Sequence, residues 1–214
     1  LQELTSYNKV LNQRNKLLKD IGFQPGLTET LDVWDMQLVS YGKKIISLRR
    51  QFMEELGEII RQIHSNLTGK KEEIRLLYEP DVEEKVFEEK LQSAREKDLR
   101  FRVTSVGPHR DDFCVQINGI DIRKYGSQGQ QRTAALSLKM SEIYLVEKVT
   151  KDHPVLLLDD VLSELDSSRQ NHLLSAIKHI QTMITCTGLD DFVNNRFQID
   201  KVFKVIDGTV INEN

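Results

Sequence analysis

Apolar residues recur at helical spacing over the first third of the chain. A first set consists of Leu4, Tyr7, Leu11 and Leu18. It predicts a helix up to about residue 19, which Gly22 and Pro25 end. A second set consists of Trp34, Leu38, Tyr41, Ile45, Leu48, Phe52, Leu56, Ile59, Ile63 and Leu67, with a shift of register after Phe52. This spacing is typical of a coiled coil or an antiparallel helical hairpin. At roughly 35 residues the second helix would span about 50 Å and project as an arm.

After Gly69 the spacing changes from helical to alternating. The expected elements are a strand at 74–78, a charged helix at 81–96, a half-buried strand at 99–106 and two strands at 113–117 and 120–122. Asn118-Gly119 joins the last two strands as a hairpin turn. This middle part of the chain is therefore predicted to be an antiparallel meander.

The remaining chain alternates helices with short apolar strands. A helix from Ser127 to about residue 151 is apolar around most of its circumference, so we expect it to be buried. The apolar runs 155–158 and 182–186 predict buried strands of a parallel sheet, the first covered on both faces. A closing hairpin is expected about Asp207-Gly208. The predicted fold class is α/β, a mixed sheet with flanking helices plus a helical arm.

Composition narrows the class of protein. With 214 residues, 39% of them hydrophobic and 29% charged, the chain can form one large domain or two small ones. Its net charge of −3 gives no overall basic character, so a nucleic-acid site would have to be a local patch. Neither a membrane-spanning run of about 18 apolar residues nor a signal peptide is visible. Cys114 and Cys186 both lie in apolar stretches, which predicts reduced thiols and a cytoplasmic protein.

Asp159 and Asp160 directly follow the apolar run 155–158. Ligands of open α/β sheets bind at the carboxyl ends of strands, where one carboxylate can hold Mg²⁺ through water and a second can orient an attacking water. Paired acids also serve as caps for a following helix, which here would begin near Val161. From these residues alone both interpretations remain open.

Two polar segments lie on either side of the acid pair. In the first, Ser127 at the N-cap and Gln130 three residues later form a capping box, and the exposed amides of that helix end suit an anion. An ordinary capped helix is the alternative. In the second segment, 163–166, Asp166 either caps the next helix or touches a nucleotide across an interface.

The order of these segments is more specific than any one of them. A capped Ser-Gln-Gly-Gln-Gln helix, an apolar strand ending in Asp-Asp and a Ser-Glu-Leu-Asp loop resemble the signature motif, Walker B strand and D-loop of an ABC-type ATPase head of the SMC kind. The resemblance is closer still to the RecF family of bacterial recombination mediators and covers essentially the whole chain. The matching segments are 157–169 with Leu173, 107–112 (Gly-Pro-His-Arg-Asp-Asp), 125–133, and 7–18 with Gln13-Arg14-Asn15.

The resemblance implies a role for each motif in an ATP-dependent homodimer. The implied residues are Ser127, Gln128, Gly129 and Gln130 for the nucleotide of the second protomer, Asp159 for Mg²⁺ through water, Asp160 for catalysis, Ser163, Glu164 and Asp166 in the D-loop, and Thr187 at the switch position. Asp160 is one methylene shorter than the usual catalytic glutamate, and Thr187 stands where many heads carry a histidine. We therefore expect slow ATP hydrolysis.

No Gly-x-x-x-x-Gly-Lys-Ser/Thr phosphate-binding loop occurs in the chain. In RecF-like proteins this loop lies in the N-terminal half. The chain therefore resembles the C-terminal three-fifths of such a protein, with a helical arm at 1–72 and the C-terminal part of the ATPase head at 73–214. ATP and Mg²⁺ are the cofactors implied for the intact protein. We expect the chain by itself neither to bind ATP tightly nor to hydrolyse it.

The family also implies a function in DNA replication and repair, with recombination at gaps and stalled forks as part of the SOS response. The intact protein would clamp DNA at single-strand/double-strand junctions and act with RecR and RecO. Candidate DNA contacts are Lys43, Lys44, Arg49, Arg50 and Lys70, whereas Lys9, Arg14, Lys16 and Lys19 are interpreted as a solvated helix face. The alternatives are an SMC-like chromosome tether, a nucleotide-binding subunit of an ABC transporter, or a helical-arm α/β domain with acidic caps.

Overall fold

The structure is a computed structural model that describes residues 2–152, 154–186 and 199–213. Its α-helices are α1 (Gln2–Ile21), α2 (Leu31–Leu67), α3 (Phe87–Ser93), α4 (Arg95–Phe101), α5 (Ile122–Tyr125), α6 (Gln128–Thr150) and α7 (Ser167–Ala176). Its 3₁₀ segments are η1 (Pro25–Thr30), η2 (Glu84–Val86), η3 (Pro108–Arg110) and η4 (Val161–Glu164). Its strands are β1 (Ile74–Glu79), β2 (Asp112–Ile117), β3 (Ile120–Asp121), β4 (Leu156–Asp159), β5 (Thr182–Thr185), β6 (Val202–Ile206) and β7 (Thr209–Glu213). Among these described helices none is long and apolar enough to cross a membrane.

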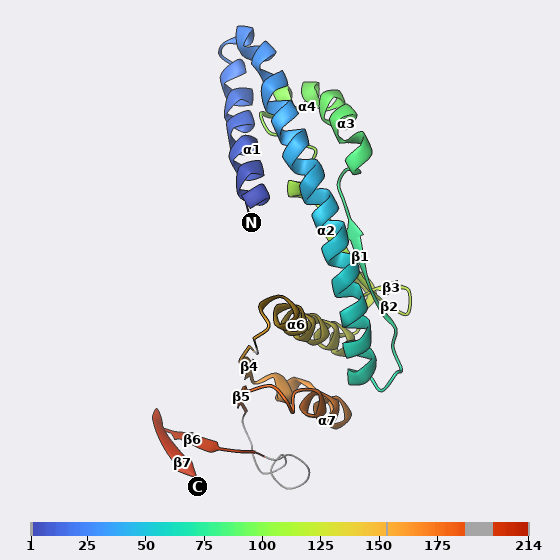
Figure 1. Cartoon of the computed structure of the whole chain (residues 1–214), viewed down its shortest axis with the longest axis vertical. Coiled ribbons are helices and arrows are strands. Elements are labelled where there is room, and N and C mark those ends of the chain that lie inside the picture. The colour runs from blue at the N-terminus through green and yellow to red at the C-terminus, as the bar shows by residue number, and fades with distance from the viewer. Residues whose placement is uncertain (1, 153, 187–198, 214) are drawn as a thin grey trace.

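The predicted helical hairpin is confirmed by α1 and α2. Figure 1 shows α1 alongside the first half of α2, with α3 and α4 against the same half of the long helix. The buried core here consists of Tyr7, Val10, Leu38, Val39, Ile45, Ile46, Val82, Phe87 and Leu91. The helical spacing in the sequence therefore corresponds to a buried apolar seam, and residues 82–91 also contribute to it.

The second half of α2 does not project as a free arm. Ile60 packs with Ile74 of β1 and Ile117 of β2, and the last turns of α2 pack against α6 and α7 (Figure 1), in a cluster that also contains Leu158 of β4. A helix that stays amphipathic over 37 residues can contribute to several cores in succession. Because α2 takes part in all of them, the division of the chain between residues 72 and 73 stays a prediction.

The apolar seam of α2 is interrupted at its middle. Leu48 and Phe52 are 56% and 46% exposed, although the spacing places them on the seam. Among the described residues, α1 lies beside the first part of α2, where its Glu3 pairs with Lys44 at 3.3 Å, and Leu48 and Phe52 lie further along α2 than this contact.

Arg14 of α1 is fully buried, so its interpretation as part of a solvated face is wrong. Its guanidinium donates to Asp35 of α2 at 2.6 Å and to Asp98 of α4 at 2.7 Å. It also donates to the Thr104 hydroxyl at 2.8 Å, and Thr104 in turn donates to the side chain of Asn15. The Gln13-Arg14-Asn15 segment is therefore a joint between α1, α2 and the segment after α4.

The strand predicted at 99–106 is not formed. Residues 95–101 are helical as α4, which ends at Arg102 in the left-handed conformation with φ of 57°. Asp98 of this helix accepts hydrogen bonds from both Arg14 and the Ser105 amide. These tertiary contacts of Asp98 outweigh the alternating pattern of the sequence.

The turn at 107–112 joins the hairpin to the first sheet. Gly107 has φ of 137°, and a Cβ there would lie 2.6 Å from the Tyr7 hydroxyl oxygen. The Asp111 carboxylate accepts hydrogen bonds from Arg49 of α2, at 2.7 Å, and from the Tyr78 hydroxyl of β1. This segment, whose role the sequence alone does not suggest, therefore fixes the angle between α2 and β1.

Three small sheets are formed by the described residues. β1, β2 and β3 are antiparallel, and the predicted Asn118-Gly119 turn joins the last two. β4 and β5 are parallel, with Leu158 opposite Ile184, and β6 and β7 form the expected closing hairpin. The prediction that the strand before the acid pair is covered on both faces is wrong for these residues, because Leu157 of β4 is 69% exposed.

Candidate functional site

The first turn of α6 is held by the predicted capping box. The Ser127 hydroxyl accepts a hydrogen bond from the Gln130 amide at 3.2 Å, and the Gln130 side chain accepts one from the Ser127 amide at 3.1 Å. Gly126 precedes the cap, and a Cβ there would lie 2.6 Å from the Ile122 carbonyl oxygen. The remaining amides at the start of this 23-residue helix give it the partial positive charge that suits an anion.

Asp159 and Asp160 lie at the carboxyl end of β4 and are both exposed. The Asp159 carboxylate accepts a hydrogen bond from the Thr185 hydroxyl of β5 at 2.5 Å. Asp160 has φ of 51°, and its side chain makes no capping hydrogen bond to η4. The interpretation of the acid pair as a helix cap is therefore not supported.

The Ser163 to Asp166 segment forms η4 and the start of α7. Ser163 donates a hydrogen bond to the Asp160 carbonyl oxygen at 2.7 Å, which ties this loop to the acid pair. Asp166 is the N-cap of α7 and accepts hydrogen bonds from the amides of Ser168 and Arg169. The bond from the Arg169 amide and the charge of its guanidinium hold the pKa of the Asp166 carboxyl below its usual range. Glu164 ends η4, and its side chain lies outside the described part of the structure.

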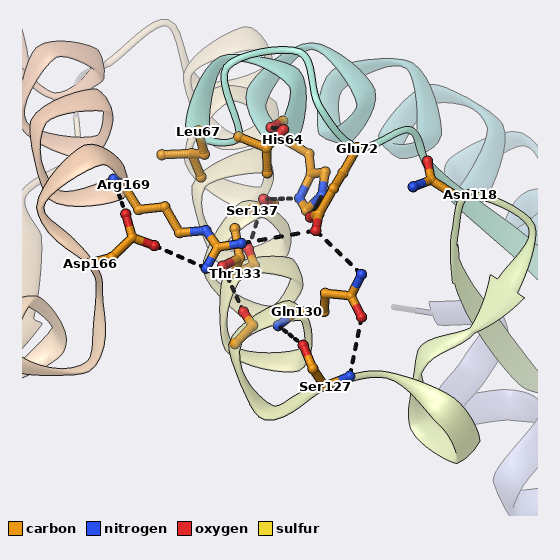
Figure 2. A network of polar contacts seen from close by, with 12 residues as sticks. His64, Leu67, Glu72, Asn118, Ser127, Gln130, Thr133, Ser137, Asp166 and Arg169 are labelled. Carbon is orange, nitrogen blue, oxygen red and sulfur yellow. Dashed lines mark hydrogen bonds and ion pairs between the residues drawn. The ribbon is translucent and has the colours of Figure 1, made fainter.

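A chain of polar contacts joins the start of α6 to the start of α7 (Figure 2). Gln130 donates to the Glu72 carboxylate at 3.3 Å, and the Arg169 guanidinium lies 3.9 Å from the same carboxylate. Arg169 also pairs with Asp166 at 3.1 Å. The two segments on either side of the acid pair are therefore connected through a residue, Glu72, that sequence reasoning missed. Its position between α2 and β1 carries no local motif that would have identified it.

His64 extends the same network into the core. The ring lies 3.2 Å from Glu72 through Nε2 and 2.9 Å from the Ser137 hydroxyl through Nδ1, and its side chain is fully buried. Burial lowers the pKa of His64, against the opposing effect of the Glu72 charge, so the ring is neutral near pH 7. The Glu72 carboxylate can only accept, so the matching tautomer donates from Nε2; the Ser137 hydroxyl has one proton for two neighbouring acceptors, Nδ1 of His64 and the Thr133 carbonyl oxygen at 2.8 Å.

The described residues contain no metal site made of side chains alone. No group of three or more His, Cys, Asp or Glu side chains in residues 2–152, 154–186 and 199–213 is arranged to hold an ion. Asp159, at an exposed strand end, offers carboxylate oxygens of the kind that Mg²⁺ prefers when water and phosphate complete its shell. Thr187, the predicted switch position, lies outside the described residues.

The five candidate DNA-binding residues do not form one surface. Arg49 is occupied by the 107–112 turn, donating to Asp111 at 2.7 Å, and Arg50 pairs with Glu83 at 2.7 Å. Lys44 lies 3.3 Å from Glu3. Lys44 and Arg49 are five residues apart on α2. At about 100° per residue, they therefore lie on different sides of the helix.

The other two candidates lie far apart: Lys43 is within the first half of α2, and Lys70 follows its last residue. Lys43 lines a groove of about 590 Å³ between α2 and the segment of α3 and α4, together with Met36 and Arg95. Lys70 follows α2 in the left-handed conformation and lines a second, shallower groove with His172. The assignment of these lysines to DNA binding stays a prediction.

Comparison with known proteins places these motifs in a family. The chain is 62% identical over its whole length to the DNA replication and repair protein RecF of Lachnospira eligens, and 60% identical over 98% of its length to RecF of Agathobacter rectalis. It spans 60% and 58% of the length of these two curated relatives. No family model matches the chain.

Solved structures give the same result. One described as the recombination mediator protein RecF-ATPrS in the RecFOR pathway superposes with a TM-score of 0.80 and 36% identity, over 98% of this chain and 57% of that one. A second, described as RecF-ATP in the same pathway, gives a TM-score of 0.79 and 37% identity over 99% of this chain and 58% of its own. The chain therefore belongs to the RecF family and corresponds to the C-terminal part of its members.

Proposed function

We propose that this chain is part of a DNA replication and repair ATPase that dimerises on ATP and clamps DNA. The observation that carries the proposal is the connected arrangement of three motifs: the capped start of α6, the exposed acid pair of β4 and the Asp166-capped start of α7. The relatives are named as RecF repair proteins, which favours this function over a transporter subunit or a chromosome tether.

The motifs divide the chemistry between two protomers. Ser127, Gln128, Gly129 and Gln130 would present the start of α6 to the γ-phosphate of ATP held by the second protomer, where amide groups and the helix dipole stabilise negative charge. Asp159 would hold Mg²⁺ through water, and Asp160 would orient the attacking water. The D-loop would approach the same nucleotide across the dimer interface. The phosphate cradle that completes this site is absent from the sequence of the chain.

DNA contacts in this proposal are mainly to phosphates, so binding weakens as salt rises. In this proposal the protein is cytoplasmic and nucleoid-associated, and it acts with RecR and RecO at single-strand/double-strand junctions. Of the basic candidates, Lys43 and Lys70 are the better ones for DNA, because Arg49 and Arg50 are engaged with Asp111 and Glu83.

Substitution of Ser127 by Arg in the full-length protein tests the proposal. A long cationic side chain at the N-cap removes the capping hydroxyl and fills the space where phosphate would bind, so ATP-dependent dimerisation should be lost. Ser93→Arg, at the exposed end of α3, is the matched control. Sedimentation analysis with and without ATP measures the outcome. Dimerisation by Ser127→Arg at the wild-type level would contradict the proposal.

A further inference from the structure

Glu72 lies in the short link between α2 and β1 and contacts three other segments of the chain (Figure 2). One carboxylate oxygen accepts from the Gln130 side chain at 3.3 Å and lies 3.9 Å from the Arg169 guanidinium. The other lies 3.2 Å from Nε2 of His64. Its side chain is only 15% exposed, so these contacts replace most of its hydration. The Glu72 carboxylate therefore links three segments of the chain, unlike an ordinary solvated side chain of a loop.

The backbone next to Glu72 is held in place by the β2–β3 turn. The Glu73 amide donates to the Asn118 side chain at 2.9 Å, and the Asn118 amide donates to the Glu73 carbonyl oxygen at 2.9 Å. On the other side, His172 of α7 contacts the Leu67 carbonyl oxygen at the end of α2, at 3.1 Å. The carboxylate therefore projects from a fixed support toward α6 and α7.

Arg169 completes the connection on the side of α7. Its guanidinium pairs with Asp166 at 3.1 Å and reaches Glu72. A Cβ at Gly129 would lie 3.4 Å from the Arg169 guanidinium nitrogen, so the absence of a side chain at this signature position leaves room for the arginine. Movement of either helix start must stretch a contact to Arg169 or Glu72.

We infer that Glu72 is a positioning residue that couples the signature end of α6 to the D-loop at the start of α7. The inference rests on the proposed function and extends it. Glu72 fixes Gln130 on one helix and Arg169 on the other, so that both reach the dimer interface in one arrangement. Without its charge, Arg169 keeps only Asp166 as an ionic partner among these residues, and the two helix starts become independent.

Glu72→Gln in the full-length protein isolates this role, because the amide keeps the size of the side chain and an acceptor for Gln130 but loses the ion pair. We expect the dissociation constant of the ATP-dependent dimer to rise about tenfold, within the range usual for coupled sites. Faster hydrogen exchange of the Ser168 and Arg169 amides, which cap on Asp166, should accompany it. The midpoint of thermal unfolding should change little. Glu73→Gln, an exposed neighbour paired with Arg75, is the matched control and should match the wild type in both measurements.

A second variant keeps the inference testable if Glu72→Gln folds poorly. Arg169→Gln, which removes the contacts to both Glu72 and Asp166, should weaken the dimer at least as much, and the double variant should lose no more than Arg169→Gln alone, since the Glu72 contact is already gone. Additive losses, or a Glu72→Gln protein that dimerises and exchanges like Glu73→Gln, would overturn the coupling role. If the wild-type protein itself shows no ATP-dependent dimer while amide exchange still responds to Glu72→Gln, the proposed function fails and the contact between the helices stands.

Discussion

The buried ion pairs of Arg14 provide the most direct energetic test of the fold. Asp98→Ala removes the carboxylate that accepts from Arg14 at 2.7 Å and from the Ser105 amide at 2.9 Å. Both charged side chains of the pair have 0% exposure. The substitution therefore leaves a fully buried guanidinium with Asp35 as its remaining carboxylate partner among the described residues.

The expected cost follows from that burial. Breaking a buried ion pair by removing one partner typically destabilises a protein by about 3–5 kcal/mol. Here Asp35 would be left to balance both Arg14 and Arg95. A whole domain has only about 5–15 kcal/mol of stability, so much of it depends on this joint between α1, α2 and α4. With a urea dependence of about 2 kcal/mol per molar, the unfolding midpoint should fall by about 1.5–2.5 M.

Urea unfolding followed by circular dichroism measures this shift. Glu58→Ala is the matched control, because it removes an ion pair of α2 at 3.1 Å whose side chains are 50% and 69% exposed. Such exposed pairs contribute about 0–1 kcal/mol. If Asp98→Ala shifted the midpoint no more than Glu58→Ala, the Arg14 cluster would not hold the hairpin together and the reasoning would be refuted.

Three further substitutions test the packing and the site. Gly42→Ala should destabilise the protein by about 1–3 kcal/mol in the same urea assay, because its Cβ would lie 2.4 Å from the Phe87 ring. Gly57→Ala is the control: its Cβ would meet nothing closer than 4.0 Å, so it should be neutral or slightly stabilising. Ser127→Ala removes the cap of α6 and should cost about 1 kcal/mol in thermal unfolding, whereas an unchanged midpoint would show that the capping box contributes nothing. Burial lowers the pKa of His64, so the unfolded chain binds a proton more readily than the folded one. Stability should be complete above about pH 6.5 and decline as the pH falls below that value, and His64→Gln should show a shallower decline in urea unfolding between about pH 7.5 and 5.5.

Local patterns in the sequence predicted much of this fold. The helical hairpin, the Asn118-Gly119 turn and the parallel pair of β4 and β5 follow from spacing and turn chemistry within a few residues of chain. The burial of Arg14 did not, because its partners Asp35 and Asp98 lie 21 and 84 residues away. A basic residue on an amphipathic helix is ordinarily solvated, and only the tertiary arrangement reverses that expectation.

In the candidate site, too, some residues could be predicted from the sequence and others could not. The caps at Ser127 and Asp166 were predictable because a capping residue and its partners lie within three residues of each other. Glu72 was not, since it meets Gln130 58 residues further along the chain, and meets Arg169 only through the packing of α7 against the end of α2. Sequence motifs thus identified the two helix starts, whereas the residue between them became visible only in the fold.

One apolar face of β4 is exposed, although the sequence predicted a strand covered on both faces. The apolar run 155–158, which overlaps β4, fits a strand covered on both faces, yet Leu157 is 69% exposed and Met183 of the neighbouring strand 62%. An apolar strand face is favourable only when something removes it from water. The acid pair lies at the end of this same strand. The relatives are longer than this chain, which covers 60% of the first of them. Tests of ATP chemistry therefore belong to the full-length protein, whereas Arg14 and its carboxylate partners are buried among the described residues.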